Sequence, residues 1–200
     1  MNIAIYTTIC DDYDKNSVII SNRNNYVSKH KYSLILDHKI STEIENISNI
    51  QFLLDCYDMI WYLSIDTLIT NMKFKIEHIS DLGPHITVCE ENIVPWQHIS
   101  HQSIVFKNTK DTKTILKTMK NNEKNWKNLP NTWATWLYAI KDDLGDILKI
   151  APSRSFNSCI WDNHNHKVFS DWKKGDFVCN LGKITSSKTA LINNILKQII

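Results

Sequence analysis

The chain has 200 residues, 42% hydrophobic and 22% charged, a composition that indicates one globular domain and argues against a disordered or fibrous chain. Its 23 Lys and Arg residues nearly balance 21 Asp and Glu residues, so the net charge of +2 provides no bulk attraction for nucleic acid. All of the basic residues except Arg23 and Arg154 are lysine, which is typical of coding in an AT-rich genome.

The cysteines and glycines narrow the class of site. Five cysteines without C-x-x-C spacing favour reduced, buried thiols over a disulfide framework or a structural zinc site. The sequence shows no basic leader and no apolar run of about 18 residues, so we expect a soluble cytoplasmic protein without a transmembrane segment. The four glycines form neither a Walker loop nor a G-x-G-x-x-G fingerprint, so groups other than a glycine-rich loop would have to bind the phosphates of a nucleotide.

Strand and helix patterns alternate along the first part of the chain. Residues 2–6 predict a strand that ends in a polar loop holding Thr7, Thr8 and an acidic cluster. Asn22 is predicted to cap a short helix, which leads into a strand at 33–36. A helix beginning at Glu43 then precedes residues 59–63, whose five bulky side chains without alternation predict a strand covered on both faces.

The second part continues the pattern. A turn is predicted at 81–84, and two short strands follow it. Two helices come next, one that begins at Thr109 or Asp111 and one that begins at Asn131 or Thr132. A stripe containing Trp136 on the second of these helices is interpreted as core. The remaining predicted elements are strands at 85–88, 103–106 and 147–151, a turn and strand at 172–179, and an amphipathic helix at 186–200. No repeat or linker is evident, so residues 1–200 are predicted to form one α/β domain, a mixed sheet flanked by helices.

A carboxylate follows the predicted buried strand directly, in Ser64-Ile65-Asp66. Ligands of open α/β sheets bind at the carboxyl ends of strands, which makes Asp66 a candidate binding residue, although it could equally cap the following turn. Two histidine pairs, His98 with His101 and His164 with His166, have metal-like spacing. Neither pair has an obvious third ligand, and we interpret both as surface residues.

Four stretches, in order, resemble the motifs of glycosyltransferase family 34 and its small bacterial and phage relatives. Residues 22–32, NRNNYVSKHKY, resemble NKxxYAxxHGY, and residues 57–71, YDMIWYLSIDTLITN, resemble YDWIWWLDxDALITN. Residues 150–158, IAPSRSFNS, are similar to VPQRxFNS, and residues 172–178, WKKGDFV, to the start of WxxGDFVxHxxG. The resemblance implies a GT-A fold, which is a Rossmann-like mixed sheet flanked by helices. It also implies transfer of a hexose or pentose, with retention, from a UDP-linked or other nucleotide sugar.

The same resemblance implies a donor site and a metal site. Its donor-binding residues are Thr7, Thr8, Tyr13, Ser64, Asp66, Arg154 and Asn157, and its ligands for Mn²⁺ or Mg²⁺ are Asp66 and Asn180. Tyr13 would stack on the base, in a loop whose Asp11, Asp12 and Asp14 we interpret as solvated. Arg154 would contact a phosphate or the sugar, with a structural ion pair as the alternative.

Three positions depart from the family pattern. Ser64 replaces the first carboxylate of the D-x-D motif, Asn180 replaces the histidine of the closing motif, and residues 134–135 are Ala-Thr where an acidic or amide pair is expected. The main alternative is therefore a catalytically degenerate GT-A protein that acts as a binding or assembly module. A nucleotide-binding domain unrelated to sugar transfer is disfavoured because no glycine-rich phosphate loop is present. The acceptor, whether glycan, lipid, protein or modified nucleic-acid base, is not specified by the sequence.

Overall fold

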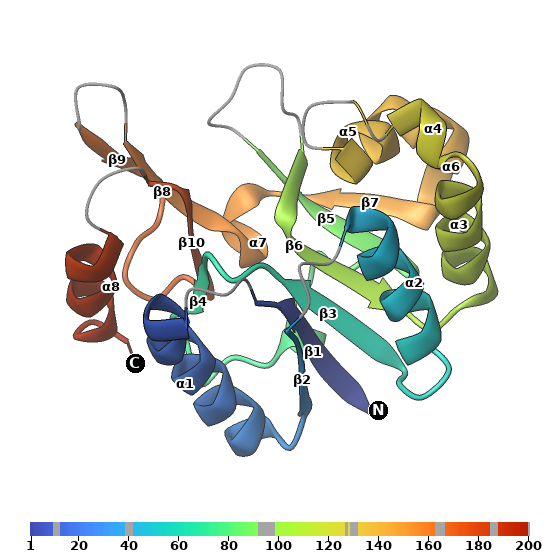
Figure 1. The fold of residues 1–200 in the computed structure, drawn as a ribbon. Helices are drawn as coiled ribbons and strands as arrows, with labels where there is room; N and C mark the ends of the chain where they lie inside the picture. Colours follow the sequence, from blue (N-terminus) through green and yellow to red (C-terminus); the bar gives the residue numbers. More distant parts are fainter. Residues whose placement is uncertain are drawn as a thin grey trace.

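A computed structural model describes residues 1–9, 13–38, 42–91, 99–126, 128, 132–162, 167–184 and 188–199 (Figure 1). The helices are α1 (Tyr13–His30), α2 (Glu43–Leu53), α3 (Lys110–Asn121), α4 (Glu123–Trp126), α5 (Thr132–Ala139), α6 (Lys141–Leu144), α7 (Ser153–Phe156) and α8 (Lys188–Leu196). The strands are β1 (Ile3–Thr8), β2 (Ser33–Asp37), β3 (Met59–Leu63), β4 (Thr67–Ile69), β5 (Ile86–Glu90), β6 (Ile99–Lys107), β7 (Leu148–Ala151), β8 (Ser158–Asp162), β9 (Val168–Ser170) and β10 (Val178–Lys183).

The larger of two sheets has six strands in the order β2-β1-β3-β6-β5-β7. Strand β6 is antiparallel to its neighbours β3 and β5, whereas the other pairs are parallel. All five residues of β3 are buried, which confirms the strand predicted from its uninterrupted apolar run. The five parallel strands therefore end, and β6 begins, at one edge of this sheet, which we call the carboxyl edge.

The smaller sheet has four strands in the order β4-β10-β8-β9. It starts at Thr67, directly after the Asp66 loop, and β10 is antiparallel to β4 but parallel to β8. Strands β4, β8 and β9 were not predicted. Two of them have three residues each, and β8 begins with a polar residue, so none carries a clear alternation or apolar run.

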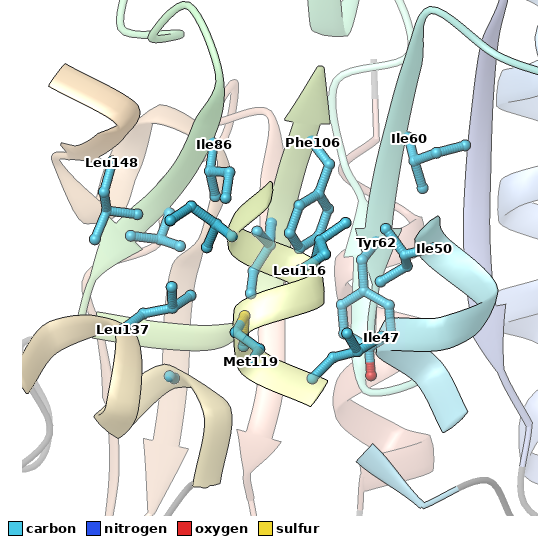
Figure 2. Packing of buried hydrophobic residues seen from close by; sticks show 14 of the residues in the cluster. Ile47, Ile50, Ile60, Tyr62, Ile86, Phe106, Leu116, Met119, Leu137 and Leu148 are labelled. Carbon is cyan, nitrogen blue, oxygen red and sulfur yellow. The ribbon is translucent and has the colours of Figure 1, made fainter. Parts of the chain in front are cut away.

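Alternate residues of the large sheet face two different layers. Figure 2 shows Ile60 and Phe106 of the sheet packed near Ile50 of α2 and Leu116 of α3. The opposite face packs Ile5, Trp61 and their strand neighbours against α1, α7 and part of the small sheet. A third cluster joins α1, the small sheet and α8, and its members include Ile19, Leu68, Cys179, Ile192 and Ile195.

Helix α1 is longer than predicted. It begins at Tyr13, so Asn22 lies in its interior instead of capping it. The Asn22 side chain donates to the carbonyl of Ile69 and accepts from its N–H, both at 2.9 Å, and so fastens α1 to β4. The cap prediction was wrong because this tertiary pairing supplies the partners that an N-cap would have found locally.

Other boundaries differ less. Thr7 and Thr8 belong to β1 and not to the loop after it, α2 ends at Leu53, and β6 begins at Ile99. Thr109 caps α3 as predicted, by accepting from the N–H of Thr112. Trp136 and Leu137 of α5 are in the core, as predicted for the tryptophan stripe. None of the helices among the described residues combines the length and hydropathy needed to span a bilayer.

Candidate active site

The loop that carries Asp66 lies at the carboxyl edge, between the two sheets. The N–H of Ser64 donates to the carbonyl of Gln102 in β6 at 2.8 Å, and the carbonyl of Asp66 accepts from the N–H of Leu181 in β10 at 2.8 Å. The N–H of Thr67 turns back to the carbonyl of Ser64 at 3.1 Å. Both sheets therefore hold the backbone of this loop, while the Asp66 side chain is partly exposed.

Arg23 of α1 lies beneath the loop and is fully buried, with a relative exposure of 0%. Its guanidinium donates to the Thr7 hydroxyl, the Ser64 carbonyl and the Thr67 hydroxyl. Burial lowers the pKa of Arg23 to about 9, while the charge of Asp66 acts in the opposite direction. Arg23 is therefore a cation at neutral pH. Sequence reasoning noted it as a rare arginine but did not predict this position.

The three predicted residues near the end of β1 have different environments. Thr7 is buried, and its hydroxyl donates to the carbonyl of Leu63 at 3.0 Å. Its side chain therefore bonds within the protein and does not face a donor directly. Thr8 is partly exposed at the last position of β1. Tyr13 is the first residue of α1, but its side chain, like Asp11 and Asp12, lies outside the described part, so its stacking on a base stays a prediction.

Asn180 lies in β10 and Asn157 directly precedes the neighbouring strand β8, and both residues are buried. The Asn180 amide donates to Oδ1 of Asn157 at 3.2 Å, and its own Oδ1 accepts from the N–H of Gly182 at 2.8 Å. Asn180 is opposite Thr67 in the β4–β10 pair, which places it next to the Asp66 loop. The structure thus brings together Ser64, Asp66, Asn157 and Asn180.

Arg154 has a partner within the protein. Its guanidinium donates to both carboxylate oxygens of Asp176, at 2.6 and 3.3 Å, and this contact raises the pKa of Arg154. Asp176 also accepts from the Ser158 hydroxyl and from the N–H of Lys173. The ion pair that we considered as the alternative role is therefore present, and a donor contact would involve the outer face of a half-exposed side chain.

Three further polar residues, which sequence reasoning did not assign to a site, lie directly after β5 or in the first half of β6. Glu91 is buried directly after β5, and Gln102 is nine-tenths buried in β6. The Gln102 side chain lies within 2.9 Å of Nε2 of His101. His101 lies in strand β6 and is partly buried, so its interpretation as a surface residue was wrong. His98, His164 and His166 lie outside the described residues.

Three of the four cysteines that the structure describes are buried, as predicted, and the fourth is not. Cys89, Cys159 and Cys179 are buried free thiols, and Cys56 is an exposed one. Burial raises the pKa of each of the three buried thiols, and the charge of Glu91 adds to the effect at Cys159. These thiols are consequently poor nucleophiles near neutral pH.

Asp66 in the loop and Asn180 in β10 are the predicted metal ligands. Asp66 offers one carboxylate, and the Asn180 amide oxygen, although it accepts from Gly182, has a second lone pair. Over the ranges that the structure covers, no three His, Cys, Asp or Glu side chains form a metal-binding group. Mg²⁺ commonly uses one or two carboxylates together with phosphate oxygens and water. The donor set therefore fits a hard cation that is held jointly by Asp66 and a diphosphate.

Comparisons with known proteins identify the fold. No family model matches the sequence, and a search of curated proteins finds no match. A glycosyltransferase involved in glycosylation of the major capsid of PBCV-1 is 14% identical, with a TM-score of 0.73 over 98% of this chain and 100% of that chain. An active-site mutant of LgtC is 11% identical, with a TM-score of 0.54 over 97% and 95% of the two chains. The bifunctional glycosyltransferase WbbM is 9% identical, with a TM-score of 0.55 over 99% of this chain and 49% of its own.

These likenesses establish the class of fold. The chain has the GT-A fold of glycosyltransferases, with a six-stranded mixed sheet flanked by helices, and this confirms the fold expected from the four motifs. In this fold, the Asp66 loop occupies the edge of the sheet at which α/β proteins bind their ligands.

Proposed function

We propose that the protein is a glycosyltransferase that takes a hexose or pentose from a nucleoside diphosphate sugar. One observation carries the proposal. In a chain with a glycosyltransferase fold, the partly exposed carboxylate of Asp66 lies at the carboxyl edge on a loop that is fixed by hydrogen bonds from both sheets. A positioned carboxylate at this edge suits a ligand that combines phosphate with a cation.

The donor would lie across the carboxyl edge. Its base would contact Thr8 and Tyr13, and its diphosphate would lie over Ser64 and Asp66. Arg154 would use its exposed face to approach the phosphate or the sugar, while Asp176 keeps the guanidinium oriented. Asn157 would act from below, through its hydrogen bond to Asn180. We propose a uridine nucleotide and retention of configuration as the first hypotheses to test.

Sugar transfer requires stabilisation of negative charge on the departing diphosphate. Bound Mg²⁺ or Mn²⁺ would supply that stabilisation by neutralising the phosphate oxygens. Asp66 would hold the cation through its carboxylate, and Asn180 through the remaining lone pair of its amide oxygen. Because Ser64 contributes no charge, we expect weaker metal binding than at a site with two carboxylates.

The acceptor hypotheses are a glycan, a lipid, a protein and a modified nucleic-acid base. The first of the similar structures is an enzyme that takes part in glycosylation of a capsid protein, so glycoprotein acceptors come first in a screen.

Incubation with a panel of nucleotide sugars, with and without Mn²⁺, tests the proposal. We expect hydrolysis or transfer with at least one donor, and loss of most of the activity after chelation with EDTA. If no donor were turned over and none were bound, the proposal that the protein is a glycosyltransferase would be wrong. Activity unchanged by EDTA would refute the metal assistance alone.

A second candidate function is a catalytically degenerate binding or assembly module. The observation in its favour is that Ser64 provides no carboxylate and that the Asn180 amide already bonds to Asn157 and Gly182. The double variant Ser64→Asp with Asn180→His distinguishes the two functions. Activity that appears only in this variant would identify the natural chain as a binding protein, whereas comparable activity in both chains supports the enzyme.

A further inference from the structure

The charge of Arg23 is buried among neutral groups. Its guanidinium contacts two hydroxyls and two backbone carbonyls, which belong to Thr7, Ser64 and Thr67. Its Nε atom is buried and has no hydrogen-bond partner among the described residues. No carboxylate forms an ion pair with Arg23 within the part of the chain that the structure describes. Such burial costs hydration free energy, which hydrogen bonds to neutral groups offset only in part.

The contacts of Arg23 converge on the two ends of one short loop. One end is the Ser64 carbonyl, which accepts from Arg23 and also from the N–H and the hydroxyl of Thr67. The other end is Thr67, whose hydroxyl and carbonyl both accept from Arg23. Asp66 lies between these two fixed points. Arg23 consequently holds the chain on either side of Asp66.

The charge of Arg23 also acts at the loop. The charge of Asp66 raises the pKa of Arg23, so the two groups interact electrostatically, and Ser64 adds no second carboxylate to the loop. A buried cation beneath a backbone loop attracts an anion above it more strongly than an exposed cation would, since little water lies between them. The loop is therefore better matched to an anionic group than the sequence Ser-Ile-Asp suggests by itself.

We propose that Arg23 is a positioning residue of the donor site, which fixes the Ser64–Thr67 loop from beneath and adds positive charge that favours a nucleoside diphosphate. This inference rests on the proposed function. Arg23 acts through Asp66 and the loop backbone, because its own side chain is fully buried.

The neighbouring residue on the helix provides a matched control. Asn22 is 4% exposed and makes two side-chain hydrogen bonds from α1 to Ile69 in β4. It fastens the same helix to the same small sheet, but among the described residues its side chain makes no hydrogen bond to the Ser64–Thr67 loop. Asn22→Ala should therefore weaken the attachment of α1 without changing the loop or its charge.

The experiment compares Arg23→Met, Arg23→Lys and Asn22→Ala with the unaltered chain. Calorimetry measures the affinity for UDP and for UDP-glucose in Mg²⁺ buffer, and thermal melting measures stability. We expect Arg23→Met to bind UDP about 10- to 100-fold more weakly, the range for losing a hydrogen-bonded charge. Arg23→Lys should recover most of the affinity, and Asn22→Ala should keep it within about twofold although its melting temperature falls.

Hydrogen exchange at the amides of residues 64–67 provides a readout that needs no ligand. These amides should exchange faster in Arg23→Met than in Asn22→Ala, because only the first substitution removes donors to the loop. Should Arg23→Met fail to fold, Arg23→Gln replaces it as the variant without the charge, and Arg23→Lys remains the variant that keeps it.

The outcomes separate the inference from the proposed function. If the unaltered chain binds no nucleotide at all, the proposed function fails, and with it the donor role of Arg23, while the exchange rates still decide whether Arg23 fixes the loop. If the unaltered chain binds UDP and a folded Arg23→Met binds it equally well, only the inference is overturned. Equal weakening by Asn22→Ala would also overturn it, because the effect would then be one of general stability.

Discussion

The central strand of the large sheet and the surroundings of the Asp66 loop bury different kinds of side chain. Strand β3, in the middle of the large sheet, consists of five apolar residues, all buried. The small sheet and its surroundings bury Thr67, Asn157, Ser158 and Asn180, with Arg23 beneath the adjoining loop. Apolar burial stabilises a fold without requiring specific partners, whereas every buried polar group needs a hydrogen bond. Strand β3 therefore belongs to the apolar scaffold, whereas the Asp66 loop and the parts of the small sheet next to it hold polar groups in defined positions.

The largest effect is expected in the scaffold, at Trp61. This residue is fully buried in β3, stacks on Phe177 with 5.2 Å between ring centroids, and donates from its indole to the Ser103 hydroxyl. Trp61→Ala should lower the free energy of unfolding by about 3–5 kcal/mol, measured by urea denaturation. Phe52→Ala, at a side chain that is 69% exposed, is the control and should change it by less than about 0.5 kcal/mol. A loss below about 1 kcal/mol at Trp61 would contradict its role as scaffold.

The next effect concerns activity and not stability. Asp66→Asn keeps the size of the side chain but removes its charge, so sugar transfer should fall by about 100-fold or more, measured with the best donor from the panel. The melting temperature should change little, because Asp66 is partly exposed. Asp142→Asn, at an exposed carboxylate paired with Lys141, is the control and should leave activity unchanged. Full activity in Asp66→Asn would exclude this carboxylate from the donor site.

An intermediate effect is expected at Asp176, which accepts hydrogen bonds from Arg154, Ser158 and Lys173. Asp176→Ala leaves these donors without their acceptor and should lower the free energy of unfolding by about 2 kcal/mol, measured by urea denaturation. Arg154→Ala should have a smaller effect on stability, since the arginine side chain is half exposed. If the two variants lost the same stability, Asp176 would contribute only through the ion pair.

A further pair of variants adds one methyl group to each region, with the smallest effect on stability expected at Gly182. A Cβ at Gly83 would lie 2.5 Å from Cβ of Lys149 in β7, so Gly83→Ala should cost about 1–3 kcal/mol in thermal or urea unfolding. A Cβ at Gly182 would lie 3.2 Å from Oδ1 of Asn180 and 3.2 Å from Nε2 of Gln102, a milder conflict with two side chains. Gly182→Ala should therefore cost less stability but weaken donor binding severalfold. The reverse order of stability losses would contradict this comparison.

The scaffold was the more predictable region because its features are local in sequence. The buried run at 59–63 predicted β3, and the spacing of apolar residues with a Thr109 cap predicted α3. The start of α1 was missed, and so were β4, β8 and β9. Short strands such as β4 and β9 owe their structure to pairing with residues far along the chain, so single-sequence periodicity does not reveal them.

The candidate site was predictable only where it adjoins a predicted strand. Asp66 was found because it follows β3 directly, Asn157 because it matches a family motif, and Asn180 because it occupies the position of that family's closing histidine. The position of Arg23 depends on three acceptor residues that are 16 to 44 positions away. The Arg154 pair likewise joins residues 22 positions apart. Sequence spacing alone could not choose between this ion pair and a ligand contact.

The buried thiols provide each sheet with its own reporter of local opening. Cys89 lies in β5 of the large sheet, whereas Cys159 and Cys179 lie in β8 and β10 of the small one. A thiol that is buried in the native state reacts with an alkylating reagent only when its surroundings open, so the labelling rate measures the free energy of that opening. Mass spectrometry of peptides labelled in native buffer would then show whether the small sheet opens independently of the large one. Its opening would be a motion available for ligand exchange while the scaffold stays intact.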